Sequence, residues 1–286
     1  MFPPYITVEK LNIFIQNALQ EDIGTGDHTS LATVGESKMG KAQLIFKDNG
    51  MVAGLELSKY IFEAVDSGLK IEYFVKDGDA VKKGEIGFVV EGKSISILAA
   101  ERLVLNCMQR MSAIATLTSD FNNAIKHTKA KLLDTRKTTP NFRMLEKWAV
   151  LIGGGKNHRF GLYDMILIKD NHIDYSGGIV NALENTANYL KNNDLDLKIV
   201  IETRNLTEVH QALSFGNIER ILLDNMPNEM LKEAVQICKG KVDTEASGGV
   251  NINTIKAIAE TGVDYISVGA LTHSYNSLDM SLKALK

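Results

Sequence analysis

Short apolar segments followed by helical segments recur along the second half of the chain, and this recurrence limits the fold more than any other feature. The predicted strand ends Glu202, Asp224, Glu245 and Gly269 lie 22, 21 and 24 residues apart. That pitch is typical of βα units joined by short loops. Such units in series build a parallel sheet covered by helices, and six or more favour closure into a barrel. The predicted strands span 131–137, 165–171, 198–204, 220–225, 241–249 and 265–270.

A different pattern fills the first 125 residues. Apolar residues at helical spacing predict an amphipathic helix over 8–20, with Thr7 as its N-cap. Residues 41–93 have the composition of short strands separated by glycine-containing turns. From residue 95 to about 125 the chain is apolar on several helical faces, which predicts a long helix buried against a second domain or subunit. We place the domain boundary inside that helix, near residue 112.

Composition excludes several classes of protein. Hydrophobic residues make up 44% of the 286 residues and charged residues 23%, as in ordinary globular domains. No apolar run approaches the roughly 18 residues of a membrane-spanning helix, and no basic region precedes an apolar stretch at the N-terminus, so we expect no signal peptide. The two cysteines, Cys107 and Cys238, fit neither a disulfide framework nor a metal-ligand spacing, which favours a reducing cytoplasm.

Charge is distributed unevenly along the chain. The net charge of −3 argues against nucleic acid or an anionic membrane as a partner. Residues 126–172, however, hold ten basic and four acidic residues, so this segment carries +6 and the remainder −9. A local positive field in an acidic protein predicts a small anionic ligand.

Several strand ends carry residues suited to such a ligand. In a parallel barrel the carboxyl ends of the strands form the active face, and the pattern places Lys169, Glu202 and Asp224 there. Two glycine turns, 247–249 and 268–270, follow the last two strands, where free backbone N–H groups at a helix N-terminus bind phosphate. The alternatives are that the charges are merely solvated and that the glycines serve only tight turns.

The positive segment contains two further groups of interest. Arg136 and Lys137 end a predicted strand, and an arginine fork matches a carboxylate or a phosphate. A triple glycine, 153–155, leads into Lys156-Asn157-His158-Arg159, although it could equally be a helix stop before a surface loop. The scattered histidines give no metal-binding spacing, and Cys107 in an apolar helix most simply packs. The inventory therefore predicts a site that binds and orients polyanions without a nucleophile of its own.

Residues 75–85 have spaced glycines that suggest half of a lipoyl or biotinyl carrier domain. No lysine stands at a hairpin tip as such carriers require, so we set this function aside. A non-catalytic binder of sugar phosphates built on a barrel stays open as an alternative from another class.

Six segments together closely resemble one family, the quinolinate phosphoribosyltransferases, or carboxylating nicotinate-nucleotide pyrophosphorylases. The resemblance runs from about Glu21 to the C-terminus, and its most specific part is DTRKTTP followed by GGGKNHRFGLYDMILIKDNH. Ala113 stands where the family usually has glycine, a small change in packing. The segments are EDIGTGDHTS, AERLVLN, DTRKTTP, GGGKNHRFGLYDMILIKDNH, EASGGVN and VGALTHS.

The resemblance implies an architecture. Residues 1–112 would form an N-terminal α/β sandwich domain and residues 113–286 an incomplete, seven-stranded α/β barrel, with the last helix packing back on the N-terminal domain. It also implies a homodimer with shared active sites, in which Arg102 reaches the neighbouring subunit's site and contacts quinolinate.

The resemblance also implies roles for individual residues. Arg136, His158, Arg159 and Lys169 would bind the carboxylates of quinolinate. Lys137 would bind the pyrophosphate of phosphoribosyl pyrophosphate (PRPP), while Glu202 and Asp224 would meet the ribose hydroxyls and the Mg²⁺ that accompanies PRPP, these three being the expected catalytic residues. The remaining expected substrate-binding residues, with the 5-phosphate loops among them, are Thr135, Ser247, Gly248, Gly249, Val268, Gly269 and Ala270.

The implied function is Mg²⁺-dependent phosphoribosyl transfer from PRPP to quinolinate with decarboxylation, a step of NAD biosynthesis that needs no organic cofactor. A related phosphoribosyltransferase that acts on another anionic base, as in the ModD-like proteins of molybdate systems, is the alternative among enzymes.

Overall fold

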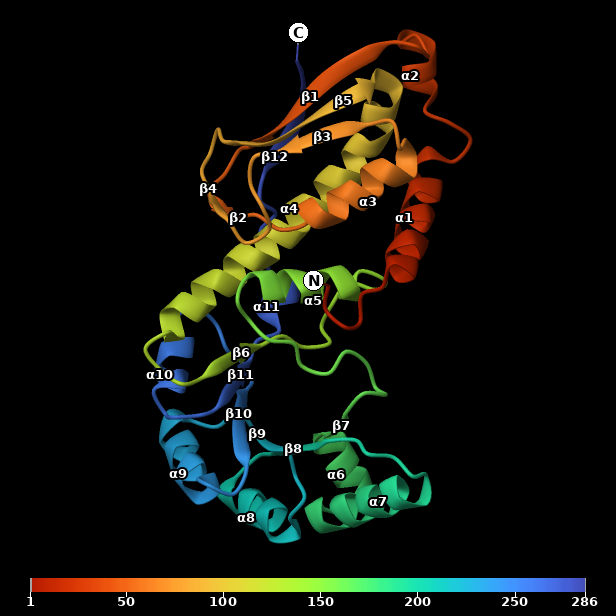
Figure 1. The fold of residues 1–286 in the computed structure, drawn as a ribbon. Coiled ribbons are helices and arrows are strands. Elements are labelled where there is room, and N and C mark those ends of the chain that lie inside the picture. The colour runs from red at the N-terminus through yellow and green to blue at the C-terminus, as the bar shows by residue number, and fades with distance from the viewer. Residues whose placement is uncertain (1, 286) are drawn as a thin grey trace. The chain divides into compact units, whose positions relative to one another are not determined.

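The structure is a computed structural model that describes residues 2–285, and these residues form two compact units (Figure 1). The first unit contains residues 2–119, 138–154 and 274–285, and the second contains Asp120–Lys137 and Gly155–His273. The predicted boundary at residue 112 lies inside one continuous helix, α4 (Ser94–Ile125). Two segments of the predicted second domain, 138–154 and 274–285, pack in the first unit.

The first unit is built on a four-stranded antiparallel sheet in the order β12-β1-β5-β3. Its strands are β1 (Met39–Phe46), β3 (Lys70–Tyr73), β5 (Ile86–Lys93) and β12 (Met280–Leu285), beside a two-stranded ribbon of β2 (Gly50–Met51) and β4 (Ala80–Val81). Its helices are α1 (Val8–Ile23), α2 (His28–Thr33), α3 (Leu55–Val65), most of α4, and α5 (Arg143–Ile152). The mixed α/β class is confirmed.

Local sequence explains the elements of this unit. The predicted first helix is confirmed as α1, because Leu11, Ile15 and Leu19 form its buried stripe and the Thr7 hydroxyl accepts the backbone N–H of Lys10 at 3.2 Å. Alternating residues of β1 and β5 face the core, where Phe88 meets Phe62 edge to face at 5.6 Å.

The prediction of a helix in the last segment is wrong. Residues Met280–Leu285 form strand β12, which pairs antiparallel with β1 from Phe46 opposite Met280 to Lys41 opposite Leu285. The alternation of buried Met280, half-buried Ser281 and buried Leu282 has the period of a strand. This pairing supplies the edge of the first unit's sheet.

Helix α5 belongs to the first unit because its buried face contacts α4. Glu146 is fully buried, and its carboxylate lies 2.9 Å from a guanidinium nitrogen of Arg110. Gly153 ends α5, and a methyl group there would lie only 2.6 Å from Cβ of Thr118. Gly154 follows in the left-handed region, with φ of +86°. The triple glycine therefore acts as a helix stop that also permits close packing.

The second unit is a six-stranded parallel sheet in the order β6-β11-β10-β9-β8-β7. Its strands are β6 (Lys131–Leu133), β7 (Ile166–Ile168), β8 (Ile199–Thr203), β9 (Arg220–Asp224), β10 (Asp243–Ser247) and β11 (Tyr265–Ser267). Instead of a seventh strand, the described residues contain an isolated parallel bridge between Leu133 and Lys156. The sheet is therefore open between β6 and β7.

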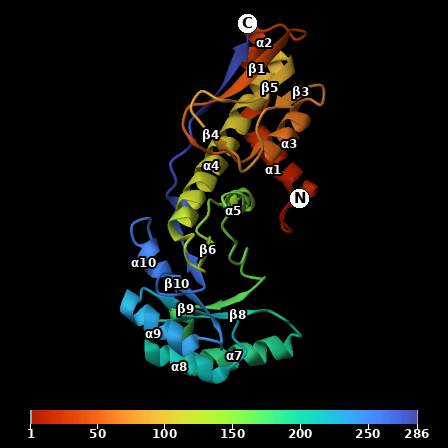
Figure 2. The same cartoon turned by 60° about the vertical axis from the view of Figure 1, so that its left-hand side comes forward.

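Helices cover the outside of this sheet, and α7, α8 and α9 lie along one side of it in Figures 1 and 2. All five residues of β8 are buried, as expected for a strand of a parallel sheet. No helix within residues 2–285 has the length and apolar character needed to cross a membrane. The helices are α6 (Asp170–Ser176), α7 (Ile179–Asn192), α8 (Leu206–Phe215), α9 (Asn228–Cys238), α10 (Ile255–Ala259) and α11 (Ala270–His273).

Candidate active site

A cavity of about 870 Å³ opens at the carboxyl ends of the parallel strands, and only residues of the second unit line it. This is the edge where parallel α/β proteins place their ligands. Every predicted site residue except Arg102 and Val268 lines this one cavity. The predicted residues that it brings together are Thr135, Arg136, Lys137, His158, Arg159, Lys169, Glu202, Asp224, Ser247, Gly248, Gly249, Gly269 and Ala270.

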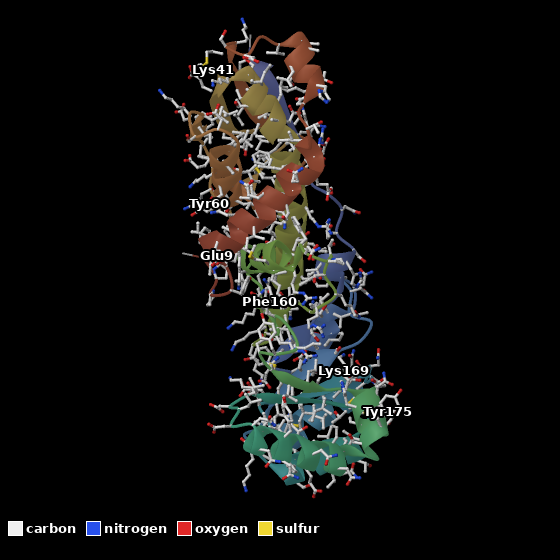
Figure 3. All side chains as sticks on the ribbon, turned by 90° about the vertical axis from the view of Figure 1, so that its right-hand side faces the viewer. Glu9, Lys41, Tyr60, Phe160, Lys169 and Tyr175 are labelled. Carbon is white, nitrogen blue, oxygen red and sulfur yellow. The ribbon has the colours of Figure 1, made fainter. Side chains whose placement is uncertain are left out.

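Cationic side chains gather on the cavity wall. Arg159 is 9% exposed, and its Nη1 donates to the backbone carbonyl of Met165 at 3.1 Å. Burial lowers the pKa of Arg159, and the positive charge of Arg136 lowers it further. Lys169, labelled in Figure 3, directly follows β7 and lines the same cavity. An anionic ligand would relieve the repulsion among these cations.

The loop that carries His158 and Arg159 is held by Asp134, a fully buried carboxylate directly after β6. It accepts hydrogen bonds from the side chain of Asn157 at 2.6 Å and from the backbone N–H of His158 at 2.8 Å. The backbone N–H of Lys156 in turn donates to Leu132. Charge-assisted bonds of this kind fix the backbone from which the cations project.

His158 lies in the cavity wall with both ring nitrogens directed at protein groups. Its side chain is 7% exposed. Nδ1 accepts the backbone N–H of Arg159 at 2.7 Å, and Nε2 lies 3.5 Å from a carboxylate oxygen of Glu245. The contact of His158 with a ligand carboxylate, which the resemblance implies, stays a prediction.

Two carboxylates line the cavity from neighbouring strands, Glu202 on β8 and Asp224 at the end of β9. Nζ of Lys169 lies 3.6 Å from Glu202. Burial raises the pKa of Glu202; the Lys169 charge opposes this rise and the Asp224 charge adds to it. Asp224 also accepts a hydrogen bond from the side chain of Asn225 at 2.7 Å. The pair offers oxygen ligands for a hydroxyl or a hard cation.

Two glycine turns complete the cavity. Gly248 and Gly249 have φ of +94° and +59°, and a methyl group on Gly248 would lie 2.7 Å from Nδ2 of Asn225 and closer still to its Oδ1. A methyl group on Gly269 would lie 2.9 Å from Cδ of Lys137, whose backbone carbonyl accepts the Thr272 hydroxyl at 2.7 Å. At both turns glycine leaves the backbone uncovered, so a ligand can approach its N–H groups, and at Gly269 the Lys137 side chain passes beside it.

The helix predicted directly after the first glycine turn starts later than expected. Helix α10 begins at Ile255, because Asn251 to Thr254 form turns of their own, with the Asn251 N–H donating to the Thr254 hydroxyl at 3.0 Å. After Gly269, in contrast, the short α11 begins at once. Backbone groups of the glycine turns, rather than a helix N-terminus, line the cavity at 247–249.

Two predicted residues lie elsewhere. Arg102 is an exposed residue of α4 in the first unit. Val268 is fully buried, and its backbone N–H donates to the carbonyl of Leu133 at 2.9 Å, so it serves the core beside Gly269. Further lining residues were not predicted: Leu167, Asp170, Leu222, Asn225, Glu245, Val250, Ser267 and His273. Glu245 could have been predicted from the sequence, because a charged residue inside an otherwise apolar, buried strand needs a partner for its charge.

The cysteines take no part in this chemistry. Burial raises the pKa of the Cys107 thiol to about 12 and that of Cys238 to about 11, so both stay protonated near neutral pH. Both are free and buried. Within residues 2–285, no three His, Cys, Asp or Glu side chains are grouped as a metal site would need. The cavity is equipped to bind polyanions and to place two carboxylates beside them.

Comparison with known proteins agrees with this arrangement. The chain matches the family model for the N-terminal domain of quinolinate phosphoribosyl transferase over residues 27–112 and that for the C-terminal domain over residues 114–283. It is 47% identical to quinolinate phosphoribosyltransferase (decarboxylating) 2a, mitochondrial, from Nicotiana tabacum, over 98% of this chain and 84% of that protein. It is 40% identical to the probable nicotinate-nucleotide pyrophosphorylase (carboxylating) of Bacillus subtilis, over 96% and 93%.

A solved structure shows the same fold. The nicotinate-nucleotide pyrophosphorylase from Francisella tularensis superposes with a TM-score of 0.91 at 37% identity and covers 98% of both chains. Sequence, fold and cavity agree: the chain belongs to the quinolinate phosphoribosyltransferase family and is an enzyme of the phosphoribosyltransferase class.

Proposed function

We propose that this enzyme transfers the phosphoribosyl group of PRPP to quinolinate and releases pyrophosphate and CO₂, with nicotinate mononucleotide as the product. The observation that carries the proposal is that one cavity holds three kinds of group at once: cations from 136–169, the carboxylates Glu202 and Asp224, and two glycine turns. Such a set suits a dicarboxylate base and a sugar bearing phosphate at two positions.

The cations Arg136, Arg159 and Lys169 hold the two carboxylates of quinolinate and orient its ring nitrogen toward the ribose. Orientation is effective here because it converts an encounter of two anions into a reaction within one complex. Burial and, after it, the positive charge of Arg136 lower the pKa of Arg159. A bound dicarboxylate relieves the repulsion between the two arginines, which adds to its affinity.

The glycine turns hold the 5-phosphate of PRPP through backbone N–H groups, and Lys137 holds its pyrophosphate. The position of Lys137 supports this role, because its side chain passes beside Gly269 and its backbone is tied to α11 through Thr272. A lysine is a mobile point charge, which suits a leaving group that moves away.

The donor set fits the Mg²⁺ that accompanies PRPP. Glu202 and Asp224 are two carboxylates on neighbouring strands, and Mg²⁺ is commonly held by one or two carboxylates together with substrate phosphates and waters. When bound, the ion would neutralise charge on the departing pyrophosphate. The two carboxylates also supply negative charge beside the ribose carbon as positive charge develops on it.

The bond changes follow from this placement. The bond between the anomeric carbon and the pyrophosphate oxygen breaks, and its electron pair leaves with pyrophosphate. The lone pair of the pyridine nitrogen then forms the new bond to that carbon. As CO₂ leaves, the electron pair of the carbon–carboxylate bond stays on the ring carbon, where the adjacent positive nitrogen stabilises it, and a proton from solvent then adds to that carbon.

We also propose a homodimer with shared active sites. Arg102 is exposed on α4 and does not line the cavity of its own chain's second unit. Leu162 and Tyr163, each 69% exposed, follow Arg159 on a loop and offer apolar surface for a protein contact. Mixing Arg102→Ala and Arg136→Ala subunits should restore activity absent from either variant alone; no recovery in verified mixed dimers contradicts sharing.

A substrate panel tests the proposed function. The purified protein with PRPP and Mg²⁺ should release pyrophosphate with quinolinate and much less with nicotinate or other pyridine carboxylates. Turnover of a different base alone would favour the ModD-like alternative, and calorimetric binding of PRPP without any pyrophosphate release would favour a sugar-phosphate binder.

The cytoplasmic location stays a prediction of the sequence.

A further inference from the structure

A line of buried ionisable groups extends from the cavity wall into the interior of the second unit. Glu245, on β10, is fully buried, and Nη1 of Arg220 at the start of β9 donates to its Oε2 at 2.6 Å. The ring of Tyr265 faces the Arg220 guanidinium at 4.0 Å from its centroid. Glu245 lines the cavity, but Arg220 and Tyr265 do not.

The same Oε2 atom of Glu245 lies 3.5 Å from Nε2 of His158. On the opposite side of the ring, Nδ1 accepts the backbone N–H of Arg159 at 2.7 Å. A ring nitrogen that accepts a hydrogen bond carries no proton, so the hydrogen-bond pattern assigns the imidazole proton to Nε2. The backbone N–H selects this tautomer by a hydrogen bond, and the negative charge of the carboxylate 3.5 Å from Nε2 favours the same tautomer.

Glu245 is ionised in this environment. Burial would raise the pKa of Glu245, but the hydrogen bonds to its carboxylate and the positive charge of Arg220 outweigh burial, so the pKa is lowered. Keeping a charged pair in a protein interior is seldom needed for stability, because apolar residues of similar size often serve as well. A role in the adjoining site explains its presence better.

We propose that Glu245 is a positioning residue that acts through His158 on Arg159. Its carboxylate, held from behind by Arg220, keeps the proton of His158 on Nε2. Nδ1 then stays an acceptor for the Arg159 backbone, and this contact places the Arg159 guanidinium, whose other anchor is the Met165 carbonyl at 3.1 Å. His158 thereby positions an anion-binding arginine. The inference rests on the proposed function only in taking quinolinate as that anion.

The substitution Glu245→Gln tests this chain of contacts, because it keeps the shape of the side chain and removes its charge. We expect the KM for quinolinate to rise about tenfold or more, as for loss of a charge-assisted hydrogen bond, and the KM for PRPP to change less than about twofold. Asp264→Asn is the matched control: Asp264 pairs with Lys129 at 2.6 Å in the same unit and does not line the cavity.

Ring ¹⁵N NMR of His158, assigned by the signals lost in His158→Gln, gives a readout without substrate. The wild-type ring should be the Nε2–H tautomer, and Glu245→Gln should reduce its share. A wild-type ring protonated on Nδ1 alone overturns the inference even if Glu245→Gln fails to fold. Equal quinolinate KM values for Glu245→Gln and Asp264→Asn overturn it too. The predicted tautomer in a protein without quinolinate turnover would instead contradict the proposed function.

Discussion

Gly248→Ala is the sharpest perturbation of the phosphate-binding turn. Gly248 has a φ of +94°, and the added methyl group would lie 2.7 Å from Nδ2 of Asn225 and closer to Oδ1. Because the Asn225 side chain must move, we expect its 2.7 Å hydrogen bond to Asp224 to break. The left-handed backbone costs about 1 to 2 kcal/mol for a residue with a Cβ, and loss of a hydrogen bond to a charged group costs about 1.5 to 3 kcal/mol.

Gly262→Ala separates these two costs. Gly262 has a similar φ of +91°, but its nearest neighbour is Cγ1 of Val235 at an ordinary 3.6 Å, and it does not line the cavity. The control variant should therefore lose thermal stability from backbone strain while its kinetic constants stay within about twofold of the wild type, a factor too small to represent a lost hydrogen bond.

The assay is steady-state release of pyrophosphate with each substrate varied in turn. In Gly248→Ala the KM for PRPP should rise about 10- to 100-fold, since each 1.4 kcal/mol of lost binding is about tenfold, while the KM for quinolinate changes little. If both alanine variants shift the KM for PRPP equally, the turn at 247–249 is not the phosphate site and the reasoning fails.

Three further predictions concern the cations, the carboxylates and the thiols. Arg136→Ala should raise the KM for quinolinate about tenfold or more with an unchanged circular dichroism spectrum; wild-type kinetics would reject its role. Burial raises the pKa of Glu202. Since its proposed role needs the ionised carboxylate, kcat should fall as the pH drops through that raised pKa. If an active Glu202→Gln variant shows the same fall in kcat at low pH, another group is responsible for it. Since Cys107 and Cys238 are buried with raised pKa values, iodoacetamide at pH 8 should leave activity intact; rapid inactivation would contradict this.

The sequence predicted the cavity residues best where topology alone decides position. Lys169, Glu202 and Asp224 follow or end parallel strands, and all such ends meet at one edge of a sheet. The turn at 247–249 was equally predictable, because the left-handed backbone of Gly248 and Gly249 leaves few alternatives to glycine. The spacing of the strand ends was therefore enough to predict most of the residues that line the cavity.

Long-range packing accounts for what the sequence could not reveal. Helix α5 packs in the first unit through contacts such as Arg110 with Glu146, which lie far apart in the chain. The final strand β12 is only six residues long and pairs with β1 near the other terminus, and such short apolar runs are ambiguous between helix and strand. The buried partners Asp134 and Glu245 act on backbone and ring nitrogens that only the folded loop brings near them.

The fate of one carbon atom tests the account most directly. Quinolinate labelled with ¹³C in the carboxylate next to the ring nitrogen is incubated with the protein, PRPP and Mg²⁺, and labelled CO₂, pyrophosphate and the nucleotide product are measured. The account predicts equimolar release of labelled CO₂ and pyrophosphate with an unlabelled nicotinate mononucleotide. Pyrophosphate release with the label retained in the nucleotide, or no turnover of quinolinate at all, would contradict it.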